Sequence, residues 1–166
     1  MPFRIVPLSL ETFAPLFSLS DEALLAQNIV RTVADRKPGF PCRVSLTDAE
    51  VGDTVLLLNH EHQPAPTPFR ASHAIYVKQG ASEARCAVGE VPALFRCRTL
   101  SLRGFDAHHM LVRASLAHGA ELEAAREQLF DDARVSYVHL HYAAAGCYAA
   151  RAERVVPDSS LAITPL

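Results

Sequence analysis

The sequence predicts a single α+β domain built on a largely antiparallel sheet. Its 166 residues fit one domain, and a hydrophobic content of 49% is enough for an ordinary core. Short segments of strand-forming residues follow one another along the chain, separated by short loops. Only residues 119–132 have the amphipathic pattern of one long helix. We therefore expect one domain over residues 1–156, followed by a C-terminal tail, 157–166, with little to hold it.

The first half of the chain predicts strands and short N-terminal helices. Residues 3–8 alternate as a first strand, which Pro7 cuts short. Ser9 and Ser20 stand where helix N-caps are expected, and two acidic residues follow Ser20 in the first helical turn. The proline and glycine residues of 37–41 and the prolines of 63–72 predict loops. In order, the further strands expected here cover 29–35, 42–46, 54–62 and 73–79.

The second half predicts two hairpins on either side of the long helix. In order, we expect a short helix over 91–97, strands over 99–106 and 110–118, the helix over 119–132, and strands over 134–142 and 147–155. Leu122, Ala125, Leu129 and Phe130 form the buried stripe of that helix. Gly146 lies in the turn of the last hairpin, where the lack of a Cβ allows a positive φ.

Composition argues against several classes of partner. The net charge is −2, from 16 basic and 18 acidic residues, without the basic stripe of a nucleic-acid or membrane-surface binder. No apolar run approaches the ~20 residues that span a bilayer, and the first residues make a poor signal peptide, so we expect a cytoplasmic protein. Its four cysteines include no C-x-x-C pair and are expected to be thiols.

The strand YVHLHY, residues 137–142, carries the main candidate site. Side chains alternate along a strand, so His139 and His141 share one face, while Val138, Leu140 and Tyr142 form the apolar other face. We expect the apolar face to pack on the long helix and the imidazoles to line a shallow polar pocket on the other side. The alternative is a half-exposed polar sheet face with no site.

Two cysteines are candidates for the same pocket. Cys42 follows a proline, precedes Arg43, and has further basic residues upstream, and positive neighbours favour the thiolate form. Cys147 follows Gly146, and the hairpin returns it to the His141 end of the previous strand. The alternative reading for each is a small buried hydrophobe.

Three charged residues complete the expected site. Arg43 and Arg70 offer bidentate donors for a carboxylate or phosphate, and Asp106 is suited to orient a histidine. The alternative for each is an ordinary ion pair, which is the more frequent role of such residues.

The remaining histidines are weaker candidates. His60 and His62 share a face at the end of the strand 54–62, but the proline-rich run that follows lacks the glutamate of a cupin motif. His108 and His109 are expected at a hairpin tip. His73 and His118 stand alone near strand ends and are expected at the surface.

The runs 38-PGFPCRVSLTDAEVGD-53, 61-EHQPAPTPFRAS-72 and 137-YVHLHYAAAGCYAARAERV-155 resemble a bacterial family of small proteins, domain of unknown function 1203. The resemblance extends from about Phe3 to Val155 and supplies no activity. It implies that family hallmarks stand at Pro41-Cys42-Arg43, Phe69-Arg70, Asp106, His139, His141 and Gly146-Cys147. Phe105 and Tyr142 depart from the Tyr and Asn that the family pattern leads us to expect.

Two functions follow from these residues. The first is an enzyme or small-molecule-binding protein whose pocket of Cys42, Arg43, Arg70, Asp106, His139, His141 and Cys147 acts on an anionic ligand. The same cysteines and histidines could instead hold zinc, although the sequence requires no cofactor and is not that of a compact zinc knuckle. The second is a non-catalytic interaction module, a homodimer formed through the histidine-bearing sheet face. Whether the protein is an enzyme is left open by the sequence.

Overall fold

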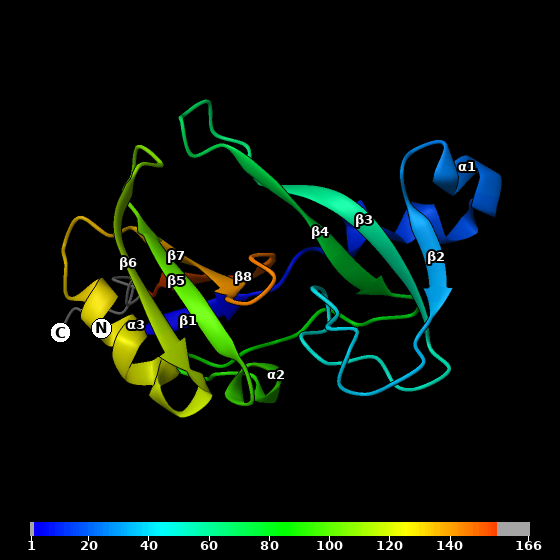
Figure 1. Cartoon of the computed structure of the whole chain (residues 1–166). Coiled ribbons are helices and arrows are strands. Elements are labelled where there is room, and N and C mark those ends of the chain that lie inside the picture. Colours follow the sequence, from blue (N-terminus) through cyan, green and yellow to red (C-terminus); the bar gives the residue numbers. More distant parts are fainter. Residues whose placement is uncertain (1, 156–166) are drawn as a thin grey trace, which may run out of the picture.

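The computed structural model describes residues 2–155, so the tail expected over 157–166 lies outside the described residues. Two antiparallel sheets, one of five strands and one of three, face each other across the molecule (Figure 1). The fold is therefore a mixed α/β fold dominated by antiparallel sheet, which confirms the coarse fold prediction. Among the described residues, no helix is long and apolar enough to cross a membrane.

The five-stranded sheet joins the two ends of the chain. Its strands lie in the order β1-β8-β7-β5-β6. In sequence they are β1 (Phe3–Val6), β5 (Thr99–Phe105), β6 (Leu111–His118), β7 (Tyr137–Tyr142) and β8 (Tyr148–Arg154). Both predicted hairpins are present, because β5 pairs with β6 and β7 pairs with β8. The first strand, β1, lies at one edge of the sheet and pairs with the last strand, β8, so that Phe3 lies opposite Arg154.

The three-stranded sheet corrects the expectation of one sheet. It contains β2 (Val30–Val33), β3 (Thr54–Gln63) and β4 (Ala71–Lys78), in that order. Residue alternation identifies strands but does not say which strands pair, so the sequence could not separate the two sheets. The expected strand 42–46 is also wrong. There, the Leu46 amide bonds back to the Cys42 carbonyl and Leu46 adopts a φ of 50°, which makes a turn.

The helices are all short. They are η1 (Leu10–Thr12), η2 (Ala14–Ser18), α1 (Asp21–Leu25), α2 (Ala93–Arg96), η3 (Gly119–Glu121) and α3 (Leu122–Phe130). Ser20 caps α1 as predicted, since its hydroxyl accepts from the Ala23 amide at 3.2 Å. Ser9 makes no such side-chain bond.

The long helix expected over 119–132 is replaced by a 3₁₀ turn and the nine-residue α3. At its start, a Cβ on Gly119 would lie 1.7 Å from the Arg96 carbonyl oxygen, so the chain is pressed against α2 there. At its end, the Asp132 carboxylate accepts from the Arg134 amide at 3.0 Å. This local bond favours a turn over a further helical turn.

The buried stripe of α3 packs as expected. Leu122, Leu129 and Phe130 share one apolar cluster with Val138 and Leu140 of β7. Alternation then places the odd-numbered residues of β7 on the opposite face, toward the three-stranded sheet. The candidate site lies between the two sheets.

Candidate functional site

Histidines from both sheets meet on the facing sides of those sheets. His139 and His141 come from β7, His62 from the end of β3, and His73 from the start of β4. The His62 ring centroid lies 5.4 Å from that of His139 and 5.1 Å from that of His141. His139 and His141 are 2% and 0% exposed. The direction predicted for the His139 and His141 side chains is confirmed. The prediction that they line a shallow pocket is wrong, because the second sheet covers these imidazoles.

His141 has a defined protonation pattern. Its Nδ1 lies 3.0 Å from the carbonyl oxygen of Gly146, which can only accept, so Nδ1 carries the hydrogen and donates it. The lone pair is therefore on Nε2, which is buried and has no hydrogen-bond partner among residues 2–155. Gly146 has a φ of 74° in the β7–β8 turn, as predicted, and the tight turn presents its carbonyl to the ring.

His62 and His73 form a stacked pair. Their ring planes are 10° apart with centroids 4.8 Å apart, and His62 Nε2 lies 2.7 Å from His73 Nδ1. The ring of Tyr148 in β8 is also nearly parallel to that of His62, with centroids 4.7 Å apart. His62 thus contacts a ring of its own sheet and a ring of the other sheet.

Two register shifts flank the histidines. Pairing of β3 with β4 shifts between Glu61 and Gln63, which leaves His62 outside the regular register. Pairing of β7 with β8 shifts between Leu140 and His141, so that His141 lies opposite Tyr148. Bulges bend strands and re-aim side chains, and they are frequent beside functional sites.

The imidazoles are held neutral. Burial is the largest cause that lowers the pKa of His62 to about 3, of His139 to about 2 and of His141 to about 4. Burial likewise lowers the pKa of His73. Positive charge nearby acts in the same direction, and Arg103 contributes to the lowering at all four rings. Neutral imidazoles can coordinate a metal ion or exchange hydrogen bonds with a ligand.

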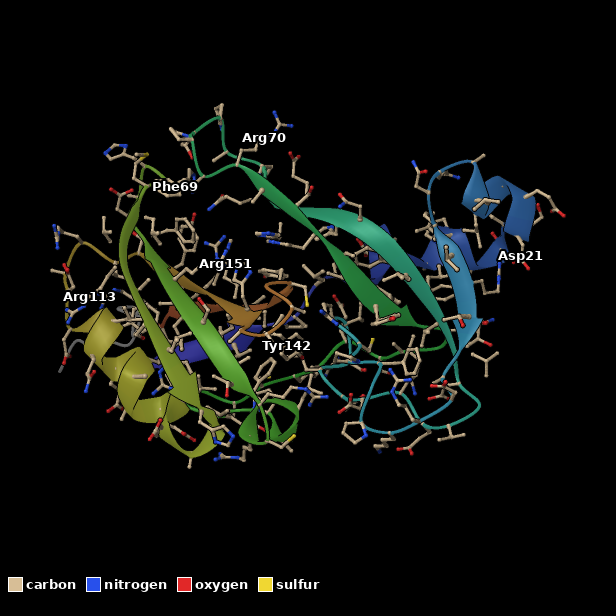
Figure 2. All side chains as sticks on the ribbon, viewed as in Figure 1. Asp21, Phe69, Arg70, Arg113, Tyr142 and Arg151 are labelled. Atoms are coloured by element: carbon tan, nitrogen blue, oxygen red, sulfur yellow. The ribbon has the colours of Figure 1, made fainter. Side chains whose placement is uncertain are left out.

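A cleft of about 640 Å³ opens beside the histidines. Its walls include His73, Arg43, Tyr142 and Cys147, together with the 143–145 turn. Figure 2 shows Arg151 directed into the space between the sheets, whereas Tyr142 lies at the end of β7, where its side chain joins the apolar cluster of the five-stranded sheet. The Tyr142 hydroxyl is buried and has no hydrogen-bond partner among the described residues.

Arg43 is buried in the wall of this cleft, with 2% of its surface exposed. Its Nε donates to the Tyr148 carbonyl at 2.8 Å, one Nη donates to the Pro41 carbonyl, and the other lies 3.2 Å from Cys147 Sγ. Its guanidinium also lies over the Tyr142 ring, 5.0 Å from the centroid. No carboxylate of residues 2–155 forms an ion pair with it.

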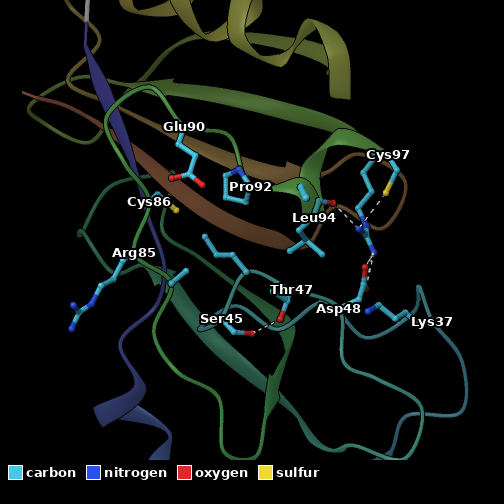
Figure 3. Close-up of a pocket in the computed structure, with 14 residues that line it drawn as sticks. Lys37, Ser45, Thr47, Asp48, Arg85, Cys86, Glu90, Pro92, Leu94 and Cys97 are labelled. Atoms are coloured by element: carbon cyan, nitrogen blue, oxygen red, sulfur yellow. Dashed lines mark hydrogen bonds and ion pairs between the residues drawn. The ribbon is translucent and has the colours of Figure 1, made fainter.

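A second cleft, of about 540 Å³, shares Arg98 with the first as a lining residue and is drawn in Figure 3. Arg98 binds both carboxylate oxygens of Asp48 at 2.7 Å, and Lys37 pairs with Glu50. Arg85 has no ion pair among the described residues, but it is exposed to solvent. The second cleft therefore offers an incoming ligand no buried charge that lacks a partner, as Arg43 does in the first.

The structure brings together only part of the residue set that the sequence predicted. Arg43, His139, His141 and Cys147 lie around the ends of β7 and β8, and they join His62 and His73 there. The other three predicted residues lie elsewhere.

Cys42 packs with the apolar cluster of the three-stranded sheet, where its Sγ accepts from the amides of Ser45 and Lys78. Arg70 is exposed at the β3–β4 turn and pairs with Glu61 (Figure 2). Asp106 accepts from the amides of His108 and Met110 and closes the β5–β6 turn rather than orienting a ring.

Cys42 is therefore expected to resist alkylation in the folded protein. It is 0% exposed, whereas Cys97 is exposed at the surface. Iodoacetamide followed by peptide mass spectrometry should label Cys97 within the time in which Cys42 stays unmodified, and urea should then release Cys42. Equal rates at the two thiols under native conditions would contradict this placement.

His62 and His73 were underestimated from the sequence. His62 lies beside a run that lacks the glutamate of a cupin motif, and His73 stands alone near a strand end, so neither has a sequence motif of its own. The signal that could have found them was the β3–β4 hairpin, which pairs His60 directly with His73 and brings His62 close to them. His60 itself turns to the ring of Phe13.

Comparison with known proteins identifies a family. A sequence model described as "Protein of unknown function (DUF1203)" matches residues 39–154. The matched segment contains all four site histidines, Arg43 and Cys147. Neither the curated proteins nor the solved structures include a match to the chain.

Proposed function

We propose that this chain, which belongs to the DUF1203 family of proteins of unknown function, binds a small carboxylate or phosphate compound in the cleft beside β7. The observation that carries the proposal is Arg43. It places a buried positive charge in the wall of the cleft with no carboxylate partner among the described residues. A buried charge is costly unless it is paired, and an anionic ligand would supply the missing partner.

The neighbours of Arg43 suit the same ligand. Arg43 uses three of its five N–H donors on Tyr148, Pro41 and Cys147, which leaves two for a ligand. Tyr142 lines the same wall, and its buried hydroxyl, which has no hydrogen-bond partner among the described residues, is a donor that a ligand could engage. Arg98 also lies over the Tyr142 ring, 5.5 Å from its centroid, but its charge is already balanced by Asp48.

The protein is proposed as a binder, and the Cys–His chemistry expected from the sequence is not part of the proposal. Within the described chain, the hydrogen-bond partner of Cys147 Sγ is Arg43, and that of His141 Nδ1 is a backbone carbonyl. A catalytic pair needs its base within hydrogen-bond reach of the nucleophile. These two side chains are instead engaged separately.

Calorimetric titration with inorganic phosphate and with succinate tests the proposal on chelator-treated protein without a histidine tag. We expect saturable binding of at least one of the two probes at one site per chain. Arg43→Lys keeps the charge but loses the planar fork, so affinity should fall by about tenfold or more. Tyr142→Phe should weaken binding while leaving the melting temperature unchanged or slightly raised, because its hydroxyl bonds nothing in the free protein.

Arg70→Ala is the matched control. Arg70 is an exposed arginine whose pair with Glu61 is outside the cleft, so its removal should change neither binding nor stability. The proposal fails if neither probe binds, or if Arg43→Lys and Tyr142→Phe bind as the wild type does.

The alternative of a homodimeric interaction module stays a prediction. The histidine-bearing face of β7 is buried inside a single chain, so it is not free to form that interface. A dimer would have to use another surface.

A further inference from the structure

We infer that His62, His73 and His141 form a binding site for one divalent transition-metal ion, with zinc the best match. One ring nitrogen of each lies within 4.8 Å of those of the other two. The inference does not depend on the proposed anion, because it rests on different side chains apart from His73, which also lines the cleft.

The ligand type suits zinc. Imidazole nitrogen is a preferred donor for zinc, copper, iron and nickel, and no carboxylate is part of this group, which argues against calcium or magnesium. Three histidines with a fourth position left for solvent or a ligand are a known arrangement at zinc sites. His73 lies at the border of the cleft, so a ligand could reach that fourth position.

His141 is already arranged as a ligand. Metal-binding histidines usually donate their second ring N–H to a carbonyl or carboxylate, which fixes the ring and directs the lone pair at the metal. His141 makes this bond to Gly146, and its Nε2 is left buried without a partner among the described residues. A fully buried lone pair with no donor is costly, and a metal ion would satisfy it.

The distances require only small movements. Two ligands ~2.0–2.1 Å from a tetrahedral ion stand about 3.3 Å apart. The ligand nitrogens of the three histidines all lie within 4.8 Å of one another, so the required spacing lies inside that limit. His62 Nε2 and His73 Nδ1 share a hydrogen bond of 2.7 Å, which bonds to the metal would replace. Rotations of these two partly buried rings would then complete the site around the fixed His141.

Charge around the site favours an anion as the fourth ligand. Arg43 is buried in the wall of the cleft that His73 also lines, so it places positive charge beside the cluster. That charge weighs against a bare dication but favours an ion that carries hydroxide, carboxylate or phosphate, since that ligand offsets part of the metal charge. A metal ion and an anion in the adjoining cleft would therefore support each other's binding.

Cobalt titration tests this site. Protein without a histidine tag is stripped with a chelator, dialysed, and titrated with Co²⁺ while the visible spectrum is recorded. We expect the absorption of tetrahedral cobalt to saturate at one equivalent, to disappear when Zn²⁺ displaces the cobalt, and the melting temperature to rise with excess Zn²⁺.

Variants assign the ligands. His73→Ala and His62→Gln change partly buried residues, so the chain should still fold, and each should weaken cobalt affinity by about 100-fold or more. His141→Ala should do the same if it folds. Two controls should keep full affinity: His108→Ala, an exposed histidine, and His139→Leu, a buried histidine beside the cluster that does not belong to it.

Three results would overturn the site. These are no stoichiometric cobalt binding, equal affinity in the His62, His73 and control variants, or a sulfur-to-cobalt charge-transfer band that disappears in Cys147→Ser. Failure of the anion titration leaves the metal result standing, because Arg43→Lys retains all three imidazoles and His73→Ala retains Arg43.

Discussion

Lowering the pH from 7 to 5 is expected to reduce the free energy of unfolding of the metal-free protein by about 4 kcal/mol through His139 and His141 alone, with a further loss from the partly buried His62. His139 and His141 are fully buried, and burial lowers their pKa values to about 2 and about 4. In the unfolded chain each has a pKa near 6.5. Below pH 6.5 the unfolded chain therefore takes up protons that the folded protein does not, and stability is lost as the pH falls.

The stability losses due to His139 and His141 stop growing at different pH values. At pH 5 each buried imidazole accounts for about 2 kcal/mol relative to pH 7. The loss due to His141 stops growing near pH 4, and that due to His139 continues toward pH 2. Most proteins lose stability in acid as carboxylates are protonated at lower pH, so a decrease that begins near pH 6.5 is diagnostic.

Urea denaturation at pH 7, 6 and 5, with chelator present, measures this effect. His139→Leu should remove about 2 kcal/mol of the decrease, the share of that imidazole, while the exposed His108→Ala should leave it unchanged. A wild-type protein equally stable at pH 7 and pH 5 would contradict the burial of these imidazoles.

The alternation of YVHLHY was enough to predict the direction of its side chains. Val138 and Leu140 pack with Leu122 and Leu129 of α3, and both histidines point the other way. Register is firmly held in such a strand, since a shift by one residue would exchange every side chain between the two faces. Local features such as the Ser20 cap and the Gly146 turn were predicted for the same reason, because each depends on neighbours in the chain.

What covers those histidines could not be predicted. Their neighbours His62 and His73 belong to another sheet, and no local pattern indicates that two sheets will lie face to face. The position of Cys42 could not be predicted for the same reason. Its place beside Arg43 in the sequence suggests a shared pocket. The Cys42 side chain instead packs in the apolar cluster of the three-stranded sheet, whereas the Arg43 side chain reaches the start of β8.

Arg43 also has a structural role that its sequence position does not reveal. It connects the loop between β2 and β3 of the three-stranded sheet to the start of β8 in the five-stranded sheet, through bonds to the Tyr148 carbonyl and to Cys147. If Arg43 served only a pocket, its removal would change stability little. The observed bonds indicate a larger effect.

Arg43→Ala is accordingly expected to lower the free energy of unfolding by about 3–5 kcal/mol. The substitution leaves the carbonyls of Tyr148 and Pro41 without their donor, at about 1–3 kcal/mol for each buried group, and removes the contact with the Tyr142 ring. Arg70→Ala, which breaks an exposed pair with Glu61, should stay within about 1 kcal/mol of the wild type.

Urea denaturation of the two arginine variants, together with Arg43→Lys, separates the roles of Arg43. The lysine ammonium can still donate to one carbonyl but cannot form the planar fork, so its stability should lie between those of Arg43→Ala and the wild type. If Arg43→Ala were as stable as Arg70→Ala, the guanidinium would not hold the two sheets together. The Arg43 guanidinium would then have no structural role, and anion binding alone would account for its burial.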